Sequence, residues 1–244
     1  MRRLVIRCLA LTLVVFLCSC FLRDLFGGFQ VDQSAIDAAS INRQIEQYLE
    51  QAETSDDINQ KARLLGLASA LLAQKGDYTK AARLARAARR ENPSQKDALA
   101  TLGECYIATG RLREAELILQ EALIADPEFV RAHYLLGNAH SAARNWTDAR
   151  ASYETALEFD SENVDVMNNL AAVLVRLNQA PRALSLLEAA IAINPELASL
   201  QRNAGLAAQA SGRRDQARAY FERYLQLNPA GGDRELVQQW IGAL

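Results

Sequence analysis

Residues that could bind a metal ion or transfer a proton are scarce in this sequence and stand far apart. His133 and His140 are its two histidines, seven residues apart in a segment of helix-forming composition. On a helix that spacing places them about 10 Å apart along the axis, so one metal ion cannot bind both. Both follow the spacing of the apolar face of their segment, and we interpret them as packed core residues with no bound metal.

Sequence motifs of the common enzyme classes are absent from all 244 residues. No Gly-rich phosphate loop ends in Lys and Ser or Thr, and there is no dinucleotide fingerprint, zinc-protease histidine pair or nucleophilic serine elbow. Cys105 stands among apolar residues, where a thiol behaves as a small inert hydrophobe. We therefore expect no enzymatic activity, no cofactor and no catalytic residue.

Cys20 is the one thiol whose surroundings predict a reaction. Three arginines occur within the first seven residues, residues 9–17 carry no charge, and a Cys-Ser-Cys cluster follows. A basic start, a short apolar run and small residues form the layout of a secretory signal. Residues 17–20 resemble the bacterial lipobox, in which a Leu and a small residue direct diacylglyceryl transfer to the following Cys thiol. The resemblance implies that residues 1–19 are a signal peptide and that Cys20 is the lipidated first residue of the mature chain.

Two features of this region leave alternatives open. Cys18 stands where the lipobox usually has a small or β-branched residue, and residues 21–26 are more apolar than a usual tether. A cleaved signal without lipid and an uncleaved membrane anchor through Leu22 are the alternatives. Under the lipoprotein interpretation residues 20–33 are a tether, and Phe21 in place of an Asp after the Cys implies sorting to the outer membrane, facing the periplasm.

Composition favours a helical protein that does not bind nucleic acid. Half of the residues are hydrophobic, 23% are charged, and there are only 12 Gly and 5 Pro, which suits a helical domain with a core. Residues 1–19 hold three arginines and no acid, so the chain from Cys20 onward has 24 basic and 29 acidic residues, a net charge of −5. Nucleic-acid binding needs clustered Lys and Arg, and this balance argues against it.

The elements that would position these few residues follow a repeat of 34 residues. Four of the five prolines share one phase, and Ser161 occupies the missing position; the prolines are Pro93, Pro127, Pro195 and Pro229. Setting these five residues as position 32 divides the chain without gaps into units 62–95, 96–129, 130–163, 164–197 and 198–231.

Three positions of the repeat keep residues of one kind in most or all units. Position 20 is always alanine, position 8 is small in the last four units, and position 24 is large in the same four. In order these are Ala81, Ala115, Ala149, Ala183 and Ala217; Gly103, Gly137, Ala171 and Gly205; and Leu119, Tyr153, Leu187 and Phe221. These residues resemble the tetratricopeptide repeat signature, with a small residue at 8, Ala at 20, an aromatic at 24 and Pro at 32. The resemblance implies an all-α solenoid of helical hairpins, stacked in a right-handed superhelix.

Helical spacing agrees with a hairpin in each unit, because positions 4, 7, 8 and 11 form one helix face and positions 20, 24, 27 and 28 another. Gly76, Gly110, Asn145, Asn178 and Gly212 are the residues that we expect to turn the chain between the two helices. Residues 232–244 are predicted to form a capping helix, with Asp233 as its N-cap and Leu236, Val237, Trp240 and Ile241 on its packed side. Residues 34–61 are predicted to be a degenerate helical hairpin or an N-terminal cap.

A second stripe of positions, 2, 5, 9, 12 and 13, lies nearly opposite the core stripe of the first helix in each unit. The resemblance implies that this stripe lines a concave groove that holds a protein or peptide segment. The side chains that we expect to face the groove are Glu104, Tyr134, Asn138, Asn168, Arg176, Arg202 and Gln209. They are small, apolar, amide-bearing or singly charged, and no metal site is expected among them.

Co-chaperones of this family clamp a C-terminal carboxylate through Lys, Arg and Asn side chains at fixed repeat positions. In this chain the best phase places Tyr134 and Asn138, then Asn169, then Ser199 and Asn203 at those positions. The amides are retained and every cation is missing, so capture of a chaperone tail by that mechanism is not expected.

A lipid-anchored array of five hairpins resembles the tetratricopeptide lipoproteins of Tad/Flp-type and type IV pilus assembly. The resemblance implies a scaffold that binds a secretin or another component and assists the assembly of a pilus or secretion system. Alternatives are an adaptor for peptidoglycan hydrolases or synthases, and a periplasmic adaptor without lipid.

Replacing the predicted acylation site tests the anchor. Cys20→Ser removes the thiol that would receive the diacylglyceryl group, so the precursor should remain unprocessed and should not incorporate a palmitate analogue. Two or three acyl chains, at about 0.8 kcal/mol per buried methylene, make anchoring effectively permanent, so the wild-type chain should stay with membranes in high salt. Label that persists in Cys20→Ser would contradict the assignment.

Overall fold

A computed structural model describes residues 33–244 of the chain; the predicted signal peptide, Cys20 and the predicted tether up to residue 32 lie outside the described residues. Throughout the described part the regular structure is helical, which confirms the all-α class. The helices are α2 (Gln33–Thr54), α3 (Ile58–Gln74), α4 (Tyr78–Glu91), α5 (Lys96–Ala108), α6 (Leu112–Ala125), α7 (Val130–Ala142), α8 (Trp146–Phe159), α9 (Val164–Arg176), α10 (Ala180–Ile193), α11 (Ala198–Ala210), α12 (Arg214–Leu227) and α13 (Arg234–Gly242). The chain divides at Gln44 into two compact units, and every hairpin lies in the second, residues 45–244.

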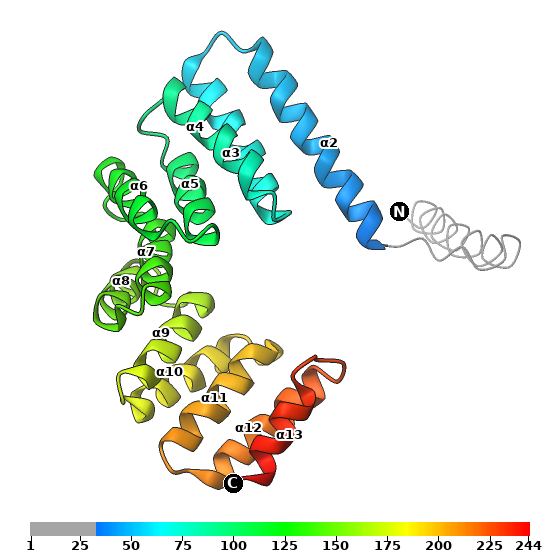
Figure 1. Ribbon diagram of the computed structural model, residues 1–244, viewed down its shortest axis with the longest axis vertical. Helices are drawn as coiled ribbons and strands as arrows, with labels where there is room; N and C mark the ends of the chain where they lie inside the picture. The colour runs from blue at the N-terminus through cyan, green and yellow to red at the C-terminus, as the bar shows by residue number, and fades with distance from the viewer. Residues whose placement is uncertain (1–32) are drawn as a thin grey trace, which may run out of the picture. The chain divides into compact units, whose positions relative to one another are not determined.

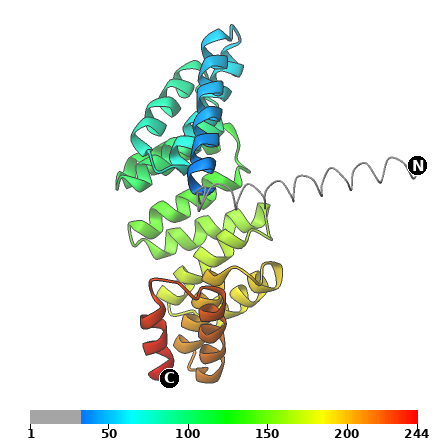
Figure 2. The ribbon, with the colours of Figure 1, turned by 90° about the vertical axis from the view of Figure 1, so that its right-hand side faces the viewer.

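The 34-residue period governs where the helices begin and end. First helices of the last four hairpins begin at residues 96, 130, 164 and 198, and their second helices begin at 112, 146, 180 and 214. Figures 1 and 2 show these hairpins following one another along the chain. The first hairpin differs, because α3 begins at Ile58, four residues before the boundary expected at residue 62. Residues 34–61 hold nearly all of one long helix, α2, and the first turn of α3.

Each hairpin turns at a residue in the left-handed conformation, at position 15 of the repeat. Four of the five residues expected from the sequence have this backbone: Gly76, Gly110, Asn178 and Gly212. In the third hairpin the expected residue, Asn145, is wrong, and Arg144 has the positive φ of 61°. The amide of Asn145 instead donates to the carbonyl of His140 at 2.8 Å, which closes the end of α7. The fixed length of the turn outweighs the local preference for Asn, so an arginine adopts a backbone that costs roughly 1 kcal/mol or more.

The two helices of a hairpin approach closely where position 8 meets position 24. A Cβ atom added to Gly137 would lie 2.3 Å from the Tyr153 ring, and one added to Gly205 would lie 2.4 Å from the Phe221 ring. At Gly103 the nearest atoms would belong to Leu119, at 2.7 Å. A real Cβ does not tolerate such distances, so the large side chain at position 24 requires glycine at position 8 in these three hairpins.

The remaining hairpins combine a larger residue at position 8 with a different residue at position 24. The fourth pairs Ala171 with Leu187, and both are buried. In the first, Ser69 is buried opposite the buried Ala85, and its hydroxyl donates to the Gly66 carbonyl at 2.7 Å. The volume lost on one helix is therefore supplied by the other, which keeps the core filled in each hairpin.

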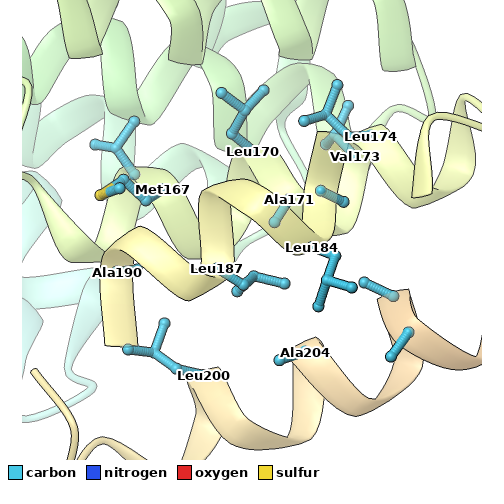
Figure 3. Packing of buried hydrophobic residues seen from close by; sticks show 14 of the residues in the cluster. Met167, Leu170, Ala171, Val173, Leu174, Leu184, Leu187, Ala190, Leu200 and Ala204 are labelled. Carbon is cyan, nitrogen blue, oxygen red and sulfur yellow. The ribbon is translucent and has the colours of Figure 1, made fainter. Parts of the chain in front are cut away.

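Alanines form the seams within and between hairpins. All five position-20 alanines are fully buried, as are the position-27 alanines Ala88, Ala122, Ala156 and Ala190. One continuous cluster of buried side chains runs from α8 to α13, and Figure 3 shows its part where Leu170 and Leu174 of α9, Leu184 and Leu187 of α10 and Leu200 of α11 converge.

The C-terminal helix α13 covers the end of this cluster with Val237, which is fully buried, and with Trp240, whose ring lies 5.5 Å from that of Phe221. Leu236, expected on the packed side, is exposed instead. Asp233 precedes α13 as expected, but its side chain makes no capping hydrogen bond. Its carboxylate accepts from the Tyr224 hydroxyl and from Arg202, and it thereby joins the last hairpin to the capping helix.

The size matching between positions 8 and 24 predicts an asymmetry between two Gly→Ala changes. Gly137→Ala should destabilise the array by about 1 to 3 kcal/mol, because the new methyl group overlaps the Tyr153 ring. Gly66→Ala in α3 is the control, since its Cβ would have no neighbour closer than 3.6 Å, and the gain in helix propensity of up to about 1 kcal/mol should leave it neutral or more stable.

Urea unfolding followed by circular dichroism measures both changes. Tyr153→Leu added to Gly137→Ala recreates the combination of Ala171 and Leu187, so it should recover part of the loss. Equal stabilities for the two Gly→Ala variants would show that this helix contact does not limit the hairpin.

Candidate functional site

First helices of neighbouring hairpins pack directly on one another, in the order α3, α5, α7, α9 and α11. Within the described residues the second helices make no such contacts with each other. The first-helix side is therefore the shorter, inner side of the stack. This is the side on which the sequence places the groove stripe.

Two adjoining hollows lie on this inner side. One, of about 320 Å³, lies between α7 and α9 and is lined by Asn138, Ser141, Ala142, Tyr153, Asn169 and Ala172. The other, of about 290 Å³, lies between α9 and α11 and is lined by Ala171, Ala172, Val175, Arg176, Asn203 and Leu206. Ala172 lines both, so the hollows form one groove across three first helices; we call it the inner groove.

A hydrogen-bonded network fixes the amide groups at the α7 end of the inner groove. The Tyr153 hydroxyl donates to Asn138 Oδ1 at 2.6 Å, and Asn169 Nδ2 donates to the same oxygen at 3.0 Å and to the Tyr134 hydroxyl at 3.2 Å. Burial, and then the neighbouring Tyr134, raises the pKa of Tyr153, so its hydroxyl stays protonated and remains a donor. Because Asn138 Oδ1 accepts two bonds, its Nδ2 group has no protein partner among the described residues and is free to donate.

The next amide pair repeats this arrangement one hairpin further on. Asn203 Nδ2 donates to Asn168 Oδ1 at 2.8 Å. This bond leaves Asn168 Nδ2 as a donor and Asn203 Oδ1 as an acceptor, each without another partner in the described part of the chain. The inner groove thus presents both kinds of hydrogen-bonding group, as a main-chain amide would require.

Ion pairs occupy most of the charged side chains of the predicted stripe. Arg131 donates to Glu104 at 2.8 Å, and Arg202 donates to Asp233 at 3.0 Å. The pKa of Asp233 is lowered, first by the Tyr224 hydroxyl and then by Arg202. Glu104 and Arg202 therefore hold neighbouring helices together and are not available as free charges.

The structure brings the predicted groove residues to one side of the stack and assigns them unequal roles. Arg176 and Gln209 are exposed, while Glu104, Tyr134, Asn138, Asn168 and Arg202 are half-buried and bonded to neighbouring hairpins. Sequence reasoning missed Asn169 and Asn203 as groove residues, although the comparison with the co-chaperone clamp had marked both. It also missed Ala172, Val175 and Leu206 as the lining of the hollows, because small and aliphatic residues carry no chemical signal of their own.

The remaining candidates for chemistry lie away from the inner groove. The ring of His133 stacks on Phe159 at 5.8 Å, and its Nε2 lies 2.9 Å from the Pro127 carbonyl. Both histidines are half-buried, so the expectation of core histidines holds only in part. Burial raises the pKa of the Cys105 thiol to about 11, which keeps it protonated and unreactive at neutral pH.

Two wider searches cover residues 33–244. No group of three or more His, Cys, Asp or Glu side chains is placed to hold a metal ion in that range. None of its helices combines the length and apolar character needed to cross a membrane.

Three segments match family models that share the description tetratricopeptide repeat: residues 72–139, 134–198 and 170–242. Together they run without a gap from residue 72 to residue 242, well over half of the chain. They include every hairpin from α4 onward and the capping helix.

Two curated relatives illustrate the range of proteins that share these repeats. The type IV pilus assembly protein PilF of Pseudomonas aeruginosa is 33% identical over 135 residues, which are 54% of this chain and 54% of that protein. The human protein O-mannosyl-transferase TMTC1 is 26% identical over 188 residues, 75% of this chain and 21% of that protein. This chain thus spans about a fifth to a half of the length of these relatives.

Solved structures agree on the fold. The structure from a functional characterization of Pseudomonas aeruginosa PilF has a TM-score of 0.65 at 18% identity, with 84% of this chain and 85% of that chain covered. YrrB, described as a repeat protein with an unusual peptide-binding site, has a TM-score of 0.59 at 19% identity and coverage of 82% and 98%. Family models, relatives and structures therefore lead to one conclusion, that this chain belongs to the tetratricopeptide repeat family and is a protein-interaction scaffold.

Proposed function

We propose that the inner groove binds an extended segment of a cell-envelope protein and that this binding assists the assembly of a pilus or secretion system. The observation that carries the proposal is the pair of adjoining hollows on α7, α9 and α11, with fixed amide groups beside them. Asn138 and Asn168 offer N–H groups, and Asn203 offers a carbonyl oxygen. These groups match the needs of a main chain without demanding a particular sequence.

The energy of such a contact would come from apolar burial and a few directional bonds. Ala172, Val175 and Leu206 supply the apolar lining, and interface energy usually concentrates in a few well-placed side chains. The groups that bind are already fixed by hydrogen bonds between hairpins, so binding orders few side chains of the scaffold.

The pilus assignment is supported by the similarity to the pilus assembly protein PilF, together with the resemblance of residues 17–20 to a lipobox. A lipid on Cys20 would hold the array at a membrane surface, and we propose the periplasmic face of the outer membrane. A secretin or another component of the same machine is the partner that fits this location. The proposal includes no catalytic step.

A groove-blocking substitution tests this function in cells. Ala172→Tyr places a large side chain where the two hollows meet, on an exposed position of α9. A deletion strain complemented with this variant should lose surface pili or secretion to the same extent as the deletion strain itself. Surface pili are counted by electron microscopy, and secreted proteins are measured in the medium.

Ala151→Tyr is the matched control, because Ala151 is an exposed alanine in the middle of α8, the second helix of the preceding hairpin. It should restore the wild-type phenotype at equal protein level. If Ala172→Tyr also restores it, the groove is not the functional site. If the deletion leaves pili and secretion intact and changes cell-wall turnover, the peptidoglycan adaptor is the better assignment.

A further inference from the structure

The hollow between α9 and α11 differs from its neighbour in chemistry. Ala171, Ala172, Val175 and Leu206 give it an apolar lining, and Arg176 and Asn203 are its polar members. The neighbouring hollow between α7 and α9 has Asn138, Ser141, Asn169 and the Tyr153 hydroxyl, so it is mainly polar. The inner groove therefore combines an apolar compartment that carries one cation with a polar one that carries none.

Arg176 is a free and positioned cation. Its guanidinium lies 6.0 Å from the centre of the Trp146 ring, which limits its conformations. Arg131 and Arg202 on the same side of the stack are paired with acids, but no acid pairs with Arg176 among residues 33–244. The other charged residue of α9, Asp165, stands eleven residues away, about 16 Å along the helix.

We propose that this hollow selects a peptide with an aliphatic side chain next to a carboxylate. The inference rests on the proposed binding of a protein segment in the inner groove and names the chemistry of that segment. At about 290 Å³, the hollow is at the lower limit for a ligand pocket and suits one aliphatic side chain. The carboxylate, from Asp, Glu or a free C-terminus, accepts hydrogen bonds from the planar fork of Arg176.

This assignment differs from the clamp of the co-chaperones in where the cation stands. Arg176 occupies position 13, at the C-terminal end of a first helix, whereas the clamp positions 2, 5 and 6 hold no free cation in the hairpins that form the groove. Arg202, at position 5, is committed to Asp233 of the capping segment. The carboxylate of the ligand is thus expected at the turn side of the groove, beside Trp146.

A synthetic heptapeptide library tests the proposal on the purified full chain in detergent. Every peptide is prepared with a free and with an amidated C-terminus, and affinities are measured by fluorescence polarisation. The tightest peptides should pair Val, Leu or Ile with a carboxylate within two residues. Loss of affinity on amidation would identify the C-terminus as the source of that carboxylate, and unchanged affinity would identify an Asp or Glu side chain.

Substitutions of Arg176 give the quantitative test. Arg176→Gln should weaken these peptides about ten- to hundred-fold, the range of a charge-assisted hydrogen bond, and Arg176→Lys should have a smaller effect because it keeps the charge and loses the fork. Arg218→Gln on the exposed face of α12 removes one charge elsewhere and should change nothing. Circular dichroism should be the same for all three variants.

The outcomes separate this inference from the proposed function. If Ala172→Tyr abolishes binding but Arg176→Gln does not, the groove binds peptides and the inferred selectivity is wrong. Selected peptides without a carboxylate, or a library without any binder, also overturn the inference. If Ala172→Tyr leaves the affinities unchanged, both the inference and the proposed groove are wrong.

Discussion

The structure depends on how closely the two helices of each hairpin approach one another. Glycine at position 8 admits the ring or branched side chain at position 24, as Gly137 admits Tyr153. Where position 8 is larger, as at Ala171 and Ser69, position 24 has leucine or alanine instead. No single hairpin can bury both of its helix faces, so this contact sets the thickness of a unit and stacking supplies the rest of the core.

The inner groove follows from that stacking. First helices contact their neighbours along the series while second helices do not, so the first-helix side is the more closely packed. There the side chains at positions 5, 6 and 9 meet across hairpins, and Tyr134, Asn138 and Asn169 become hydrogen-bonded to one another. The scaffold and its binding surface are therefore built from the same residues, which explains why amides fixed for stability can also present free donors and acceptors.

The fold was predictable because its determinants repeat: five alanines at position 20 and four prolines in one phase gave the hairpins and nearly all their boundaries. The site was predictable only as a helix face. Helical geometry placed Arg176 and Gln209 on that face, but it could not tell that Asp233 pairs with Arg202 or that Arg131 pairs with Glu104, since those bonds join residues about 30 positions apart. Arg144 and Leu236 differed from expectation for the same reason, because packing around them outweighed local preference.

Site-specific photo-crosslinking in living cells tests most directly whether the inner groove is the surface that binds. A benzophenone amino acid at position 172 or 209, both exposed on first helices, should give a covalent adduct with a cell-envelope protein. The same probe at position 151, on a second helix, should give none. Adducts from position 151 alone would place recognition on the outer side of the stack and contradict the account.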